Sequence, residues 1–274
     1  MIELAPDNPY GLSLRTPVLA AAGCLGYGVE YARLIDIDQL GAIVTRSTSL
    51  YGRRRATPRL LETPAGLLGA GEWPDPGLAY VLDQCAPVWA GWRTPVILSV
   101  VGGHADEFAA IVAATEGVEG IAGIELNLAQ HAEHAAGITA AARAATPLPL
   151  LAKLPYGLAL GPLAQAVAAA GADALTIAAP PHGLAPDPRS GELVSGWLAG
   201  PAIRPLVLAA VRVVAQSVGC PIVGCGGVGA PADARALLAA GATAVQVGSA
   251  LLINPHSAGA IGAALCGSDL PLSS

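Results

Sequence analysis

The sequence predicts an α/β fold of the TIM (β/α)8 barrel class, on three observations. The 274 residues suffice for one barrel domain, which commonly takes about 250 residues. Short runs of Val, Ile and Leu alternate with Ala-rich helical stretches, as expected when parallel strands are buried on both faces and helices cover the outside. Eight such strand–helix units can be drawn, which favours a closed barrel over the alternative, a doubly wound open sheet. We therefore expect one domain over residues 1–274.

Each predicted strand is a run of apolar residues bounded by turn or helix signals. In chain order, the strands are expected at residues 18–22, 42–46, 96–100, 123–127, 150–154, 174–178, 221–225 and 244–248. Helices are expected between them at residues 106–117, 163–172, 203–219 and 231–242, several ended by glycine, as left-handed caps require.

Two connections are longer than barrels usually need. They run from Ser47 to Trp92 after the second strand and from Pro180 to Gly200 after the sixth. Both leave carboxyl ends of strands, where barrel enzymes keep their active sites. We expect both to serve as lids or substrate walls.

The charge balance argues against a nucleic-acid partner. The net charge is −6, and the one dense basic run is Arg53, Arg54 and Arg55. This run is either a solvated turn or an anion clamp. No charged residue occurs between Arg235 and Asp269, but glycine, asparagine and proline interrupt that stretch. It is therefore interpreted as buried barrel rather than a membrane span.

The cysteines indicate a reducing compartment. They are five in number and form no CxxC pair: Cys24, Cys85, Cys220, Cys225 and Cys266. An odd set of unpaired thiols does not fit a disulfide framework. The first residues also lack the basic and then apolar pattern of a signal peptide. A cytoplasmic location is expected.

Glycines follow the last two predicted strands. Gly226 and Gly227 end the seventh strand, and Gly248 and Ser249 end the eighth. Glycine lets backbone N–H groups approach an anion, and barrels often hold a phosphate at this place. The pair of turns predicts a phosphate site, although glycine turns are common in this composition.

Lys153 is the chain's single lysine among fourteen basic residues. It lies in "LLAKLPYG", at the carboxyl end of the fifth strand, inside an apolar run where a chance surface lysine is not expected. A compact ammonium there would stabilise negative charge on a ligand, such as the N1/C2=O end of a reduced flavin. Asn127 ends the fourth strand and offers a donor and an acceptor to a heterocycle, or simply forms a turn.

These residues, together with a series of motifs in order, resemble the class 1 FMN-dependent dihydroorotate dehydrogenases over nearly the whole chain. The motifs are "TPVLAAAGCLGYGVEY", "LGAIVTRSTSL", "TPRLLETPAGLLG", "ELNL", "AKLPY", "AGADALTI", "LAGPAIRPLVL", "PIVGCGGV" and "AGATAVQVGSALL". The resemblance implies a cytoplasmic flavoprotein of pyrimidine biosynthesis, with FMN across the barrel mouth. It also implies a homodimer, a possible electron-transfer partner subunit, and no membrane or nucleic-acid partner. FMN phosphate is expected on Gly226, Gly227, Gly248 and Ser249, and its ring near Ala21, Gly23, Arg46, Ser99, Asn127, Lys153 and Gly200.

The chain departs from the family pattern where the family keeps its catalytic cysteine. After "ELN" the sequence reads Ala129, Gln130, His131 and Ala132, and Gln130 takes the cysteine's place. An amide is barely basic, so it cannot remove a substrate proton near neutral pH. Substrate-binding asparagines of the family are also replaced, by Gly69, by Ala132 and by Ala178 or Ala179, and the usual lysine of "VTRST" is Arg46. Binding of orotate is therefore expected to be weak.

Four other side chains are candidates for the base. His131, His134 and His182 carry imidazoles, which titrate near neutral pH, and Cys24 follows the first strand. Each is alternatively a surface histidine or a small buried residue. His131 is the preferred catalytic candidate, beside Lys153.

Three functions follow. The preferred one is an FMN-dependent oxidoreductase acting on CH–CH groups with an altered substrate. The alternative is a non-catalytic FMN-binding scaffold or regulatory barrel. A phosphate-binding lyase or isomerase without flavin is the third.

Overall fold

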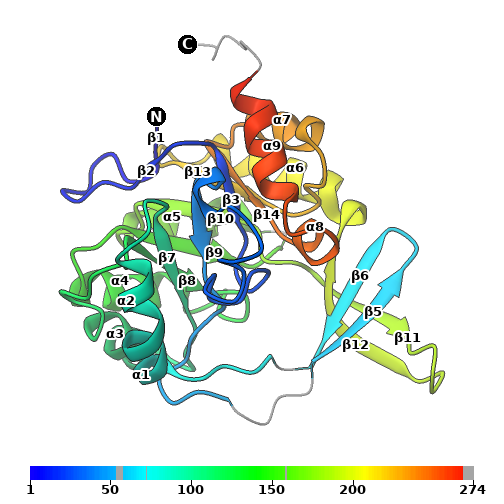
Figure 1. Ribbon diagram of the computed structural model, residues 1–274, viewed down its shortest axis with the longest axis horizontal. Helices are drawn as coiled ribbons and strands as arrows, with labels where there is room; N and C mark the ends of the chain where they lie inside the picture. Colours follow the sequence, from blue (N-terminus) through cyan, green and yellow to red (C-terminus); the bar gives the residue numbers. More distant parts are fainter. Residues whose placement is uncertain (54–57, 72, 158, 268–274) are drawn as a thin grey trace.

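The structure is a computed structural model that describes residues 1–53, 58–71, 73–157 and 159–267. Eight parallel strands close into a barrel, which confirms the predicted TIM fold (Figure 1). Every predicted strand lies in it, some ending one or two residues early. In order around the barrel they are β3 (Val18–Ala20), β4 (Ala42–Val44), β7 (Val96–Val100), β8 (Gly123–Asn127), β9 (Leu150–Leu154), β10 (Ala174–Ile177), β13 (Ile222–Cys225) and β14 (Ala244–Val247), which pairs with β3.

The barrel interior is apolar at one end and polar at the other. Near the strand starts, Leu19, Ile97 and Leu151 pack together with Leu4 and Leu14 of the amino-terminal segment. That segment forms a hairpin of β1 (Ile2–Glu3) and β2 (Ser13–Leu14), which closes this end. Near the strand ends the inward side chains are polar. The apolar end of the interior is closed by packing, so a binding or catalytic site is expected at the polar end, where the barrel strands have their carboxyl ends.

Helices cover the outside of the barrel, and the four that the sequence predicts are present (Figure 1). Their apolar faces carry buried residues, for example Phe108 and Ile111 of α3. The helical segments are η1 (Ile37–Gln39), α1 (Leu78–Tyr80), η2 (Val81–Cys85), α2 (Ala86–Trp89), α3 (Ala105–Ala113), α4 (Ala135–Ala145), α5 (Leu160–Ala169), η3 (Pro201–Ile203), α6 (Arg204–Ala215), α7 (Pro231–Ala239), α8 (Ser249–Ile253) and α9 (Ser257–Cys266).

The two long connections build a second sheet that the sequence analysis did not predict. Its strands are β5 (Arg59–Thr63), β6 (Gly66–Ala70), β11 (His182–Pro186) and β12 (Leu193–Ala199), all antiparallel in the order β11-β12-β6-β5. Figure 1 shows this sheet standing to one side of the barrel. Its small core contains Leu61, Leu68 and Ala185. The strands hold glycines and a proline, so their sequence lacks a strong alternating pattern.

The uncharged stretch after Arg235 forms barrel structure, as predicted. It contains β14, α8 and α9, and α9 packs against β3 and η1. Within the described ranges, no helix has the length and apolar character needed to cross a bilayer.

Candidate functional site

A cavity of about 740 Å³ opens at the carboxyl ends of the barrel strands. Its lining comes from the loops after several barrel strands and from the antiparallel sheet, through Leu60, Leu67, Gly69, Trp197 and Ala199. The two long connections therefore wall the cavity, as predicted. Arg53 of the basic run also lines it, whereas Arg54 and Arg55 lie outside the described residues.

The cavity brings together five of the predicted site residues. They come from the loops after β3, β4 and β8 and from the ends of β8 and β9: Gly23, Arg46, Asn127, His131 and Lys153. The guanidinium of Arg46 lies over the ring of Trp73, 5.8 Å from its centroid, and donates to the carbonyl of Pro74.

Ser99 reaches the site through a chain of hydrogen bonds. The Nδ2 of Asn127 donates to Ser47 Oγ at 3.0 Å, and Ser47 Oγ lies 2.9 Å from Ser99 Oγ. Ser99 itself is completely buried. The two serines therefore fix the orientation of the Asn127 amide, which leaves its carbonyl oxygen to accept from the N–H of Ala129 at 3.3 Å.

Lys153 stands in a buried polar network at the top of the barrel interior. Its Nζ donates to Gln246 Oε1 at 3.0 Å and lies 3.7 Å from Glu125 Oε1. Glu125 Oε2 accepts from Gln246 Nε2 at 2.6 Å and from Thr176 Oγ1 at 2.9 Å. Sequence analysis missed these three partners. Each of the three could have been found in the sequence as a polar residue at an inward position of an otherwise apolar strand.

Two thiols adjoin this network. Burial raises the pKa of Cys24 to about 12, and it also raises the pKa of Cys225. Both side chains are therefore neutral thiols near pH 7. Burial opposes the charge of Lys153, but Cys225, Glu125 and Cys24 favour it, and the pKa of Lys153 is raised above its ordinary value.

The glycines predicted to bind phosphate end two adjacent strands, because Cys225 of β13 is in register with Gln246 of β14. Gly226 and Gly227 have φ of 137° and 73°, conformations that favour glycine. Among the described residues, no loop or cap carbonyl accepts from the backbone N–H of Gly227 or Gly248, which lie outside the paired strands. Unpaired donors at the mouth of a barrel fit an anionic group.

The remaining predicted cofactor residues lie beside the cavity rather than on its surface. Ala21 is buried at the end of β3, near Gly248. Gly200 has φ of 112°, and a Cβ there would lie 2.5 Å from the Cα of Gly66. Gly200 thus permits close packing between the chain after β12 and the start of β6. Ser249 begins α8.

The candidate bases occupy different places. Gln130 and His131 line the cavity, and the imidazole of His131 meets the ring of Phe108 edge to face. His134 is exposed just before α4. His182 is exposed on β11 and its ring packs at a tilt of 57° against that of Trp197, with centroids 3.8 Å apart. Only His131 of these three histidines lines the cavity.

The positions where the family asparagines are replaced are also resolved. A Cβ at Gly69 would meet no atom closer than 3.8 Å, so this wall has room for a side chain. Ala179 lines the cavity, Ala178 is buried behind it, and Ala132 is exposed. The cavity thus offers few hydrogen-bonding groups on this side.

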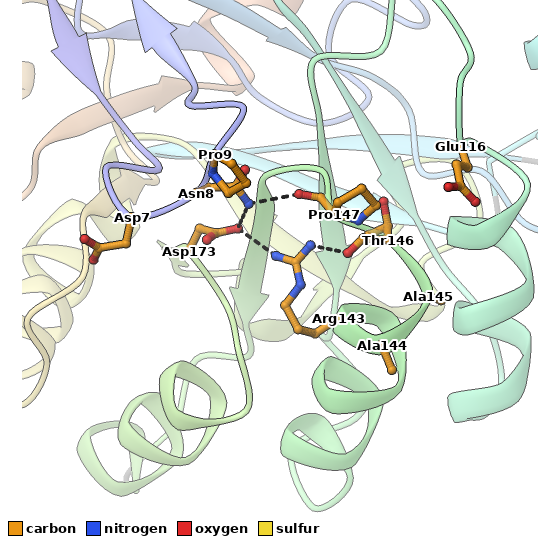
Figure 2. A pocket seen from close by; sticks show the side chains of 10 residues that line it. All are labelled: Asp7, Asn8, Pro9, Glu116, Arg143, Ala144, Ala145, Thr146, Pro147 and Asp173. Carbon is orange, nitrogen blue, oxygen red and sulfur yellow. Dashed lines mark hydrogen bonds and ion pairs between the residues drawn. The ribbon is translucent and has the colours of Figure 1, made fainter.

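A second cavity, of about 600 Å³, lies at the starts of β9 and β10, at the opposite end of the barrel (Figure 2). Two of its charged groups, Arg143 and Asp173, form an ion pair (Figure 2). Asp173 Oδ2 accepts from Arg143 at 3.0 Å, from Asn8 at 3.2 Å and from the N–H of Leu150 at 2.7 Å. We interpret this cluster as structural. In neither cavity, nor elsewhere in the described ranges, do three or more His, Cys, Asp or Glu side chains gather as a metal site.

Comparison with known proteins decides the family. The dihydroorotate dehydrogenase family model matches residues 6–265. The chain belongs to the dihydroorotate dehydrogenase family. Its curated relatives include proteins named dihydroorotate dehydrogenase B (NAD(+)), catalytic subunit. The one from Desulforudis audaxviator is 39% identical, with 93% of this chain and 89% of the relative aligned. The one from Porphyromonas gingivalis is 37% identical, with 94% and 90% aligned.

The cavity of this member of the dihydroorotate dehydrogenase family brings Lys153 and Asn127 together with Gln130 and Gly69. Lys153 and Asn127 stand at adjoining strand ends, in register with each other. Gln130 and Gly69 line the same cavity. The family is therefore shown, while the reaction of this member is a separate question.

Proposed function

We propose that this chain is an FMN-dependent oxidoreductase that acts on a CH–CH group of a substrate other than dihydroorotate. The observation that carries the proposal is the position of Lys153, a buried cation that lines the cavity, together with two glycine turns that follow the neighbouring strands β13 and β14. The bound FMN would supply the hydride acceptor.

We assign the following binding and catalytic roles to the chain's own residues. Gly226, Gly227, Gly248 and Ser249 would hold the phosphate, and Lys153 would face the electron-rich edge of the ring. Ala21, Gly23, Arg46, Ser99, Asn127 and Gly200 would surround the ring. His131 would remove the substrate proton, because it is the cavity histidine nearest in sequence to Gln130.

The altered substrate is supported by one part of the cavity wall. Gly69, Ala129 and Ala179 present no polar side chain there, while Leu60 and Trp197 add apolar surface. A site that offers no hydrogen-bonding side chain at these positions discriminates less strongly in favour of orotate. We infer a substrate that places an apolar group against this wall.

A non-catalytic FMN-binding barrel is the second candidate. It is favoured by Gln130, an exposed amide where the family places its base. The relatives are named catalytic subunits, and we propose that this chain likewise works with a partner subunit that passes electrons. We also propose a homodimer of single-domain chains, and a cytoplasmic location in keeping with free cysteines in the described ranges.

One experiment separates these functions. The purified protein is titrated with FMN by absorption and fluorescence, and the complex is then mixed anaerobically with dihydroorotate and a panel of saturated cyclic amides and carboxylic acids. Bleaching by a panel member other than dihydroorotate supports the oxidoreductase. Bound FMN that none reduces supports the scaffold, and absence of FMN binding refutes both.

A further inference from the structure

Glu125 is a charged residue sealed inside the barrel. Its side chain is completely buried on β8, and so is that of Gln246 on β14, which lies across the barrel. Two donors bond Glu125 Oε2, whereas Oε1 has no hydrogen bond among the described residues and lies 3.7 Å from Lys153 Nζ. One oxygen of the carboxylate is thus anchored, and the other faces the ammonium.

Gln246 connects the two charges. Its Oε1 accepts from Lys153 at 3.0 Å, and its Nε2 donates to Glu125 at 2.6 Å. A glutamine amide offers an acceptor and a donor at once, so both of its ends are used in the same orientation. Thr176, in register with Lys153 on the neighbouring strand, fixes the carboxylate from a third side.

Burying such a group is costly unless it is paired, and a buried ion pair seldom stabilises a fold more than apolar packing would. The rest of the barrel interior is filled with apolar side chains such as Leu19, Ile97 and Leu151. The polar layer is confined to the end that opens to the cavity, where Lys153 lines the floor. A role of these buried polar residues in ligand binding at the cavity explains why they lie at this end of the barrel.

We propose that Glu125 and Gln246 are positioning residues that hold the Lys153 ammonium charged and fixed at the cavity floor, where it serves as a permanent cation for an anionic group of a bound ligand. The identity of that ligand rests on the proposed function. The arrangement in which Glu125 and Gln246 hold the ammonium, called the lysine seat below, does not depend on it. Glu125 and Gln246 themselves do not line the cavity.

Among the titratable groups that face Lys153, Glu125 should contribute most to keeping its ammonium charged. These groups are Glu125 from β8, Cys225 from β13 and Cys24 from the loop after β3. The pKa values of both thiols are raised, so both thiols are neutral near pH 7. Glu125 is then the anion that offsets the burial of the ammonium. Without it, burial alone lowers the pKa of a lysine.

The single lysine makes the test direct. Protein labelled with ¹³C-lysine gives one Cε resonance from this sequence, and its chemical shift reports the charge of Lys153 during a pH titration. In the wild type we expect the ammonium to remain charged as far into alkaline pH as the fold persists. In Glu125→Gln the Cε signal should instead titrate within the pH range in which the protein stays folded, because the burial of Lys153 is then no longer offset by an opposite charge.

Two further variants complete the design. Glu119→Gln removes an exposed acid and should leave the Lys153 titration unchanged. Gln246→Leu keeps the carboxylate but removes the hydrogen bond to the ammonium, so the midpoint should fall less and the Cε signal should report greater mobility. If Glu125→Gln does not fold, Gln246→Leu alone decides. A titration identical to the wild type in the folded variants overturns the proposal.

A second measurement, the midpoint potential of bound flavin, tests whether Glu125 and Gln246 act on the cofactor through Lys153. With FMN bound, the midpoint potential of the flavin in Glu125→Gln should fall at the pH where Lys153 loses its proton, a step absent from the wild type. Lys153→Ala should show the lower potential at every pH. If the wild type binds no FMN, the proposed function fails while the NMR titration still tests the lysine seat. If FMN binds and the folded variant shows neither the step nor the NMR shift, the lysine seat fails alone.

Discussion

The imidazole of His131 meets the phenyl ring of Phe108 edge to face, with centroids 5.6 Å apart and planes at 89°. Phe108 is completely buried in α3, so the contact ties the loop after β8 to a rigid helix. The N–H of His131 also donates to the carbonyl of Leu128 at 2.9 Å. The ring is thereby held at the cavity lining, although it follows the position of the family base by one residue.

His131 should act as the base for the true substrate. Flavin reduction should then require this imidazole as the proton acceptor. His131→Ala should lower the rate by about 10²–10⁴-fold and leave FMN bound. Stopped-flow absorbance with the substrate that first bleaches the flavin measures this. His134→Ala is the matched control, and an unchanged rate of flavin reduction in His131→Ala would return this histidine to a structural role.

Dihydroorotate should reduce the flavin poorly. Loss of a general base typically costs about 10²–10⁴-fold in rate, and the missing contacts at Gly69 and Ala179 would weaken binding further. The double substitution Gly69→Asn with Gln130→Cys should recover part of the rate, because Gly69 has room for a side chain. Gln165→Cys places a thiol on an exposed helix position and should recover nothing. Bleaching by dihydroorotate in the wild type as fast as in a relative with the cysteine would refute this prediction.

Cys24 should be unreactive despite lining the cavity. Burial raises its pKa to about 12, so the nucleophilic thiolate is scarce near neutral pH and increases only as the pH approaches that value. A short pulse of iodoacetamide at neutral pH, followed by peptide mass mapping, should modify the exposed Cys266 well before Cys24. Equal labelling of the two would reinstate Cys24 as a candidate base.

Gly200 should be required for stability. Alanine there would face both a φ of 112° and a contact of 2.5 Å with the backbone of Gly66. Gly200→Ala should lower the free energy of unfolding by roughly 1–3 kcal/mol. The matched control is Gly137→Ala within α4, where a Cβ meets no atom within 4 Å and helix propensity should raise stability by about 0.5–1 kcal/mol. Urea unfolding compares the two, and equal midpoints would contradict the packing argument.

The barrel could be predicted because its eight strands are continuous apolar runs, a pattern that burial on both faces requires. The antiparallel sheet could not be predicted, because Gly66, Gly69 and Pro186 interrupt its strands. In addition, the pairing of β6 with β12 joins two segments that are far apart in the sequence. Lys153 and Asn127 were found because their residue types are rare in this chain. Glu125 and Gln246 were missed because they are 121 residues apart, and only closure of the barrel brings them together.

The antiparallel sheet also has a consequence for biosynthesis. The β5–β6 hairpin emerges from the ribosome early, but its partner β12 ends only at Ala199. Until then β6 of the nascent chain is an edge strand, unpaired at Leu67 and Leu68 on the side that later meets β12, and chaperones and proteases recognise such surfaces. The cavity wall is therefore a late product of translation, and truncated chains that stop before β12 would carry an unfinished site.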